Sequence, residues 1–260
     1  MSQPSAPRAT PVLEGVRALV TGGTSGLGFA MSRALAGAGA RVALTGRTEQ
    51  RVQDAATQIA RDARVTGLVM DVRDEQSVSA GVDRALAVLG GVDVLVNNAG
   101  LGMRTVNPDF MTEPAGFWQV SPDGFRDLFA TNVLGYFLVA RAIVPHMLEA
   151  GHGKIVNISV SETTMRRRGF TPYGPSRAAT DALSHIMAAD LAGTGIDVNL
   201  LLPGGATRTG MAPDSVPDDG RTWLDPAIMG PPICWLASRI SDGLTDQRIV
   251  ATDFADHPPA

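Results

Sequence analysis

The sequence has little of the material on which several classes of protein depend. Its 260 residues include one cysteine, Cys234, and four histidines, which excludes an intramolecular disulfide and argues against a zinc site. The net charge is −4, so we expect no basic surface for nucleic acid or anionic membranes. No apolar run reaches the roughly 18 to 20 residues of a spanning helix, and Met1–Thr10 lacks the apolar centre of a signal peptide. These absences predict a cytoplasmic protein that binds no metal, nucleic acid or membrane and begins with a disordered tail over residues 1–13.

Short apolar runs alternate with longer segments of helical character along the rest of the chain. The runs are apolar on both faces, which is typical of strands covered by helices on both sides. Segments such as Glu75–Leu89 and Ala178–Leu191 carry apolar residues at three- and four-residue spacing. The pattern predicts an α/β fold over 14–260, a single-domain, doubly wound parallel sheet with helices on both faces. The expected strands are Arg17–Thr21, Arg41–Leu44, Gly67–Met70, Val92–Val96, Lys154–Ile158 and Ile196–Leu202.

Two irregular stretches, residues 101–121 and 204–225, interrupt the alternation and are rich in Gly and Pro. Each follows an expected strand, so each is expected at the carboxyl edge of the sheet, where open α/β sheets bind ligands. We interpret them as substrate loops.

A glycine-rich turn, Thr21–Gly28, joins the first expected strand to a helix. Glycines allow a backbone to approach a pyrophosphate closely, and a helix N-terminus adds a favourable partial positive charge. The spacing is TGxxxGxG rather than GxGxxG, and a plain strand-to-helix turn is the alternative interpretation. Its place after the first strand of an α/β alternation favours a dinucleotide site that includes Gly22, Thr24, Ser25, Gly26 and Leu27.

The end of the second strand indicates which dinucleotide is bound. An acid there would accept a hydrogen bond from the ribose 2′-hydroxyl, but the segment reads Leu44-Thr45-Gly46-Arg47. The Arg47 guanidinium suits a 2′-phosphate, although a solvated charge near a helix end is the alternative. NADP(H) is the favoured cofactor, and NAD(H) stays as the alternative.

These residues and several later motifs resemble the short-chain dehydrogenase/reductase family, over about Glu14 to Thr252. The resemblance implies a Rossmann-like domain whose cofactor fingerprint is TGGTSGLG, and whose structural and relay asparagine is Asn132. It implies further cofactor contacts at Asp71, Val72, Asn98, Ala99, Gly100, Tyr173, Arg177, Pro203, Gly204 and either Thr207 or Thr209.

The resemblance also implies a catalytic tyrosine, Tyr173, in the run YGPSR. A phenol has an ordinary pKa near 10, and a nearby cation lowers it toward the range useful for general acid/base work. The family places a lysine four residues later, whereas this sequence has Arg177. Arginine stays protonated, so it still stabilises a phenolate, but it is a poor proton donor for a relay.

The family's substrate-oxygen serine is ambiguous here. Val160 stands 13 residues before Tyr173, where the serine usually lies, and Ser159 and Ser161 flank it. A one-residue bulge after the strand would present Ser161, which we favour over Ser159.

The expected function is therefore hydride transfer between NADP(H) and a small carbonyl or secondary alcohol, with Asn132, Ser161, Tyr173 and Arg177 as catalytic residues. The alternatives are the same chemistry with NAD, or a sensor or scaffold that binds a dinucleotide without turnover because Arg177 replaces lysine.

Two further patterns bear on the substrate and on assembly. The run Arg166-Arg167-Arg168 is either a solvated charge cluster or a site for an anionic substrate group. Small residues at Ala178, Ala179, Ala182 and Ala188 suit close helix packing, and the resemblance implies a homodimer or homotetramer.

Overall fold

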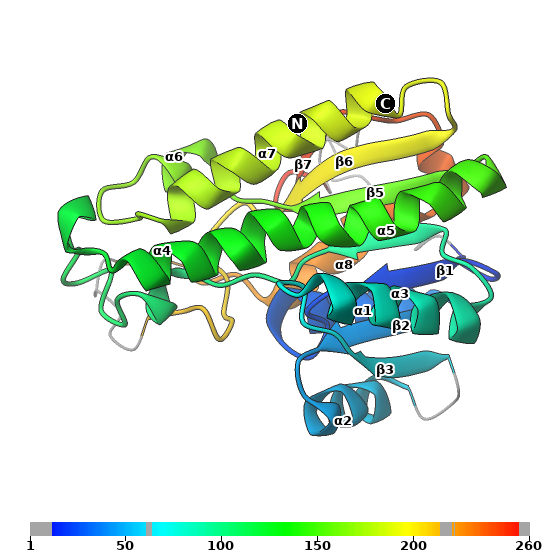
Figure 1. Ribbon diagram of the computed structural model, residues 1–260, viewed down its shortest axis with the longest axis horizontal. Coiled ribbons are helices and arrows are strands. Elements are labelled where there is room, and N and C mark those ends of the chain that lie inside the picture. Colours follow the sequence, from blue (N-terminus) through cyan, green and yellow to red (C-terminus); the bar gives the residue numbers. More distant parts are fainter. Residues whose placement is uncertain (1–11, 61–63, 214–219, 221, 255–260) are drawn as a thin grey trace, which may run out of the picture.

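The computed structural model describes residues 12–60, 64–213, 220 and 222–254. Within them, seven strands form one parallel sheet in the order β3-β2-β1-β4-β5-β6-β7 (Figure 1). The strands are β1 (Arg17–Val20), β2 (Arg41–Gly46), β3 (Val65–Val69), β4 (Val94–Asn97), β5 (Gly153–Ile158), β6 (Ile196–Leu202) and β7 (Arg248–Val250). The predicted doubly wound fold is confirmed.

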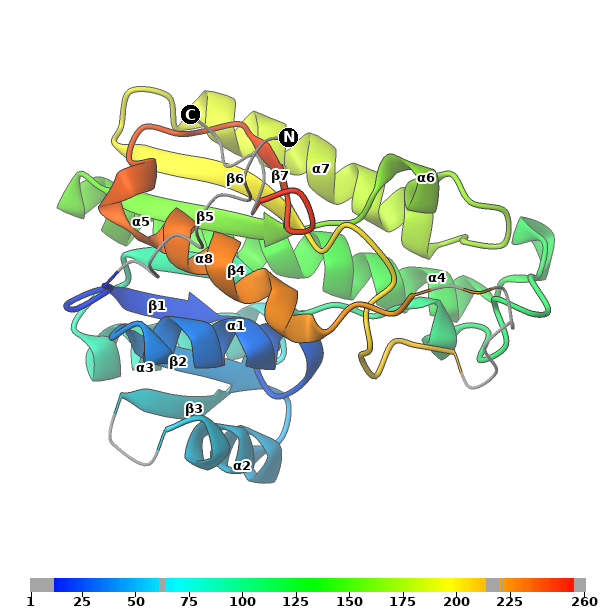
Figure 2. The same cartoon turned by 180° about the vertical axis from the view of Figure 1, so that it is seen from behind.

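Helices cover both faces of this sheet. The α-helices are α1 (Gly26–Gly37), α2 (Glu49–Ile59), α3 (Glu75–Leu89), α4 (Pro122–Phe129), α5 (Gly135–Ala150), α6 (Glu162–Met165), α7 (Tyr173–Asp190) and α8 (Gly230–Ala237). Helices α3, α5 and α7 lie on the face seen in Figure 1, and α1 and α8 lie on the opposite face (Figure 2).

The alternation of side chains along each strand divides the core into two clusters. In β1, Ala18 and Val20 pack with α1 and α8, while Leu19 between them packs with α3 and α5. All three are fully buried. Because both faces are buried, the strands are apolar throughout, as the sequence indicated.

One long helical stretch differs from what the apolar runs predicted. Residues Pro122–Ala150 form a continuous helical stretch of 29 residues that is long and apolar enough to cross a membrane by length and composition. In the sequence, isolated polar residues interrupt this stretch, so it does not stand out as one long apolar run. Half of its most apolar window is buried in the protein, and α5 supplies Val139 and Ile143 to the core. This is the pattern of a core helix on a sheet.

The expected tail over residues 1–13 and the second expected substrate loop are described only in part. Residues 1–11 of the expected tail lie outside the described residues, but Leu13 is buried and its N–H donates to the Ala38 carbonyl at 2.7 Å. The ordered domain therefore includes Leu13. In the second expected substrate loop, residues 214–219 and 221 lie outside the described residues.

The strand order places the predicted motifs together. The order of the strands changes direction at β1: β2 and β3 extend the sheet on one side of it, and β4 to β7 extend it on the other. Loops from the carboxyl ends of β1 and β4 therefore meet there, and open α/β sheets bind ligands at this switch point.

Candidate active site

A cavity of about 1300 Å³ lies along the carboxyl ends of the strands. Every residue predicted to contact the cofactor lines it, and so do the two alternatives for the nicotinamide end, Thr207 and Thr209, and both candidate serines. The predicted contacts are Gly22, Thr24, Ser25, Gly26, Leu27, Arg47, Asp71, Val72, Asn98, Ala99, Gly100, Tyr173, Arg177, Pro203, Gly204 and Thr207. The sequence motifs thus converge on one site.

The glycine turn is held against the segment that follows β4. The Asn98 side-chain amide donates to the carbonyls of Thr21 (2.9 Å) and Gly22 (3.1 Å). A Cβ on Gly28 would lie 2.3 Å from Asn98 Nδ2 and 2.4 Å from the Gly22 carbonyl oxygen. Glycine is therefore required there for close packing, and Gly22 itself has a φ of +65°, which favours glycine.

The start of α1 fits a phosphate group. Ser25 precedes the helix and makes no side-chain capping hydrogen bond, and the first turn contains no acidic residue. Backbone N–H groups at this end therefore keep their capacity for an anion, and the helix adds a partial positive charge. Because Ser25 and Gly26 line the cavity, these residues fit the pyrophosphate of a dinucleotide.

A cluster of charged residues lies at the end of the cavity beside β2. We call the part of the cavity that runs from the glycine turn to this cluster the cofactor groove, and this cluster its far end. Arg47 and Arg51 follow β2 and line the cavity. Beside them, Arg73 forms an ion pair with Asp71 at 2.7 Å. The hydrogen bonds from Arg73 outweigh the opposing effect of burial, so the pKa of Asp71 lies below its ordinary value. The carboxylate is thus ionised and already neutralised by Arg73.

Tyr173 and Arg177 lie one helical turn apart at the start of α7. The expected helix started later, at Ala178, whereas the structure begins α7 at Tyr173. This earlier start puts both side chains on the same helix face. The Arg177 Cζ lies 5.3 Å from the centroid of the Tyr173 ring, and both residues line the cavity.

The Arg177 guanidinium is buried and anchored. Its Nη1 donates to the Ile158 carbonyl at 2.9 Å and to the Tyr136 hydroxyl at 3.0 Å. It fits because Gly100 has no side chain: a Cβ there would lie 2.5 Å from Arg177 Nη2. Burial alone would lower the pKa of Arg177, but the oxygens of Tyr136 and Tyr173 raise it above its ordinary value. The group is a permanent cation beneath the cavity.

Asn132 lies behind the cavity wall rather than in it. It is fully buried in the π-helical turn Ala130–Leu134. Its side chain accepts from the Leu101 N–H (2.8 Å), donates to the Leu101 carbonyl (3.0 Å) and donates to the Ser176 hydroxyl (3.0 Å). It therefore fixes the loop after β4 against the start of α7.

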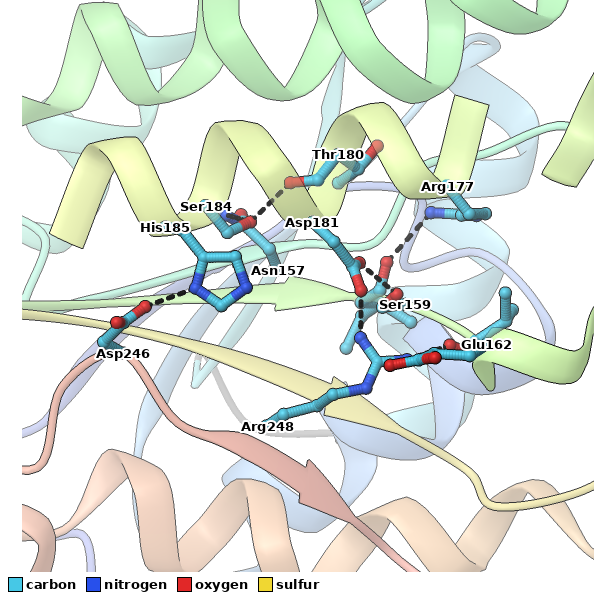
Figure 3. A network of polar contacts seen from close by, with 12 residues as sticks. Asn157, Ser159, Glu162, Arg177, Thr180, Asp181, Ser184, His185, Asp246 and Arg248 are labelled. Atoms are coloured by element: carbon cyan, nitrogen blue, oxygen red, sulfur yellow. Dashed lines mark hydrogen bonds and ion pairs between the residues drawn. The ribbon is translucent and has the colours of Figure 1, made fainter. Parts of the chain in front are cut away.

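The two candidate serines have different surroundings. Ser161 precedes α6, where its Oγ accepts from the Thr164 N–H at 3.3 Å and lies 2.9 Å from the hydroxyls of Thr163 and Thr164. Ser159 is buried, and its hydroxyl donates to the carboxylate of Asp181 on α7 (Figure 3). The single proton of the Ser159 hydroxyl is thus directed away from the cavity.

A charged network supports Ser159 from behind. Arg248 of β7 pairs with the other oxygen of Asp181 (Figure 3). It also donates to the carbonyl of Val160. The Asp181 and Arg248 side chains are 14% and 27% exposed, so the pair is largely shielded from water. It ties the end of β5 to α7 and β7 at the edge of the site.

Sequence reasoning missed several residues around the cavity. Tyr136, Asp181 and Arg248 were missed because only the fold brings them to the site. Arg51 and Arg73 carried a usable signal, since each lies within one turn of a predicted contact. The apolar wall includes Met103, Phe110, Met111, Phe170, Met211 and Trp223.

Residues 17–220 match the family model described as short chain dehydrogenase. The chain belongs to the short-chain dehydrogenase/reductase family. Family membership makes it an oxidoreductase of this class.

Among curated short-chain dehydrogenases, the chain is similar to gluconate 5-dehydrogenase of Gluconobacter oxydans. The two are 35% identical over 193 residues, which cover 74% of this chain and 72% of the relative. It is also 34% identical to sulfoacetaldehyde reductase 2 of Chromohalobacter salexigens over 187 residues, or 72% and 71% of the two chains.

Solved structures of the family extend the likeness over nearly the whole chain. A gluconate 5-dehydrogenase from Burkholderia cenocepacia, in complex with NADP and tartrate, superposes with a TM-score of 0.82 at 31% identity. The match covers 94% of this chain and 96% of that one.

Proposed function

We propose that this short-chain dehydrogenase transfers hydride between NADP(H) and a small carbonyl compound or secondary alcohol. The observation that carries the proposal is the position of Tyr173. Its ring lines the same cavity as the glycine turn, with the Arg177 cation 5.3 Å away. A phenol next to a permanent cation, at the end of a dinucleotide groove, is suited to proton transfer to or from a substrate oxygen.

Charge at the groove's far end supports NADP(H). Arg47 and Arg51 line the cavity there, and the one lining carboxylate among the described residues, Asp71, is paired with Arg73. Guanidinium groups bind a 2′-phosphate, whereas an unpaired acid would repel it. The solved relative from Burkholderia cenocepacia is described as binding NADP.

The chain's own residues divide the remaining work. The bound cofactor supplies or accepts the hydride. In reduction, Tyr173 gives its proton to the carbonyl oxygen as the carbon receives hydride, and an alcohol results. Arg177 stabilises the phenolate that Tyr173 becomes. Ser161 donates a hydrogen bond to the same oxygen, since the Ser159 proton is engaged with Asp181. Asn132 holds the loop and helix that frame the site.

A second candidate is a short-chain dehydrogenase homologue that binds the dinucleotide without turnover. The observation that favours it is the anchoring of Arg177, because Nη1 is engaged by the Ile158 carbonyl and the Tyr136 hydroxyl. Val160 also replaces the family's usual serine. In that case the cavity would serve as a cofactor sensor.

We also propose that the chain assembles as a homodimer or homotetramer. The exposed apolar residues Phe137 of α5 and Ile186 of α7 lie on the helices of one face, where packing against another copy would cover them.

The deciding experiment measures NADPH oxidation with a panel of ketones, aldehydes and keto acids for the wild type and Tyr173→Phe. Cofactor binding is followed in the same samples by NADPH fluorescence. The proposal expects turnover by the wild type, and loss of at least about 10²-fold in kcat for the variant, which should still bind the cofactor. Cofactor binding without turnover of any substrate would instead establish the second candidate.

A further inference from the structure

The cavity is far more positive than the protein as a whole. The chain has a net charge of −4, yet among the described residues that line the cavity Asp71 is the only acid, and it is paired with Arg73. Arg47 and Arg51 belong to the cofactor groove. Two further cavity arginines, Arg104 and Arg167, lie outside that groove, and the cofactor phosphates do not account for them.

The three consecutive arginines after α6 have different surroundings. Arg166 forms an ion pair with Glu162 at 3.5 Å, and its side chain is 82% exposed. Arg167 and Arg168 are exposed as well, and Arg168 does not line the cavity. Arg167 does line the cavity, and it makes no ion pair with any residue in the described ranges. Its Cζ lies 5.0 Å from the centroid of the Phe170 ring, over one face. That contact orients the side chain without neutralising it.

Phe170 lies between Arg167 and Tyr173 in a chain of contacts, because it touches both residues. The ring centroids of Phe170 and Tyr173 are 6.4 Å apart, and those of Phe170 and Phe110 are 5.4 Å apart. Phe110, Phe170 and Met103 form a small apolar cluster, and Tyr173 packs against it. One small molecule can therefore place a carbonyl at Tyr173, lay its carbon chain on the apolar cluster and present an anionic end to Arg167.

We propose that the substrate is a keto acid, or the hydroxy acid formed from it, whose carboxylate Arg167 binds. The inference rests on the proposed function and names its substrate class. An unpaired guanidinium is the best side-chain partner for a carboxylate, because it can donate two parallel hydrogen bonds. Binding this group at Arg167 holds the molecule in the cavity and leaves the carbonyl at its other end free to reach Tyr173.

The kinetic test compares a series of keto acids with their methyl esters, which keep the carbonyl and lose the charge. Arg167→Gln is expected to raise KM for the acids about tenfold and to leave KM for the esters and kcat for both nearly unchanged. The matched control Arg168→Gln removes the same charge one residue away and should leave both substrates unaffected. Equal effects of the two variants on the acids would overturn the inference, because distant electrostatics would then explain the preference.

A binding test separates this inference from the proposed function. Malonate, which carries carboxylates and no reducible ketone, is titrated by calorimetry into the NADP⁺ complexes of the wild type and both variants. We expect about tenfold weaker binding in Arg167→Gln alone, with affinity falling as salt is added. Arg167-dependent malonate binding without turnover of any carbonyl would support the anion site and refute the proposed function. Carbonyl turnover with malonate binding and acid KM indifferent to Arg167 would refute the anion site and leave the proposed function standing.

Discussion

Arg177 takes the position that the family resemblance assigns to a lysine, and its neighbours are suited to a guanidinium. A guanidinium is larger than an ammonium and needs more hydrogen-bond acceptors. The Tyr136 hydroxyl and the Ile158 carbonyl supply two, while Gly100 leaves the space. The Nε atom is buried and finds no hydrogen-bond partner in the described part of the chain. The arginine is thus accommodated by its neighbours and is not a simple exchange of one cation for another.

Removing the Arg177 side chain should therefore affect stability as well as chemistry. Arg177→Met leaves the buried Tyr136 hydroxyl and Ile158 carbonyl with fewer partners, and we expect the free energy of unfolding to fall by about 3 kcal/mol. Tyr136→Phe removes one acceptor of Arg177 and one 3.3 Å hydrogen bond to the Ile158 carbonyl, but leaves the Arg177 bond to that carbonyl, and should cost about 1 kcal/mol. Urea unfolding of the wild type and both variants measures this. Equal stability of Arg177→Met and wild type would contradict the anchoring role.

Arg47 offers a second test at the scale of one residue. Arg47→Asp replaces a guanidinium by a carboxylate at the end of β2, which should weaken NADPH binding at least about tenfold and improve NADH binding. Fluorescence titration with both cofactors measures the ratio. Arg33→Asp, which changes charge equally on α1 outside this cavity, is the control. If both variants shift the ratio alike, Arg47 does not read the 2′-phosphate.

At the scale of elements, the Ser159, Asp181 and Arg248 network joins three segments that lie far apart in the sequence. It connects the end of β5, the third turn of α7 and the short edge strand β7. A largely shielded ion pair adds little stability compared with an apolar pair in its place. Removing one partner, however, is strongly destabilising because it leaves the other charge unpaired.

A double-mutant cycle tests the network. Asp181→Ala should lower the free energy of unfolding by about 3 kcal/mol, because it leaves the Arg248 guanidinium unpaired. Arg248→Met in the same chain should recover most of that loss. Thermal and urea unfolding of both single variants and the double variant measure the coupling. Additive losses would show that the two side chains act independently.

The elements also show what the sequence could predict. Strands with apolar residues on both faces were found to within a few residues, since burial on both sides leaves a clear signal. The spacing of apolar residues placed the start of α7 five residues late, at Ala178, whereas the helix begins at Tyr173 and has Pro175 in its first turn, where proline is well tolerated. The preference for Ser161 over Ser159 rested on an expected bulge alone, because the contacts of Ser159 with Asp181 and of Asp181 with Arg248 are revealed only by the fold.

At the scale of the whole molecule, the Asp93 carboxylate makes the stability of the folded protein depend on pH. Burial would raise the pKa of Asp93, but hydrogen bonds from the Arg17 side chain (2.5 and 2.9 Å) and backbone N–H (2.8 Å) more than offset this and lower it. A carboxyl whose pKa is lower in the folded state stabilises that state above its unfolded pKa of about 3.9. The contribution disappears as pH falls through the lower, folded value.

Asp93→Asn should therefore reduce the free energy of unfolding by about 1 to 3 kcal/mol at pH 7, and the difference from the wild type should vanish in strong acid. Asp197→Asn is the control of opposite sign, because burial raises the pKa of Asp197. Its stability relative to the wild type should improve as pH rises. Urea unfolding between pH 2.5 and 7 measures both, and parallel curves for the two variants would contradict the assignment.

The molecule as a whole was more predictable than its site. The parallel sheet follows from periodicity, and the convergence of the cofactor motifs follows from the glycine turn together with the family resemblance. The positive charge around the cavity does not, because Arg104 and Arg167 come from separate loops and nothing in their local sequence distinguishes Arg167 from Arg166 or Arg168.

The two tyrosines of this chain, Tyr136 and Tyr173, both lie against the Arg177 guanidinium, whose Cζ is 5.8 Å and 5.3 Å from their ring centroids. Every tyrosine signal in the protein's ultraviolet absorption and Raman spectra therefore originates at the floor of the active site. The chain contains its own optical probe, and events at that floor can be followed without attaching a label.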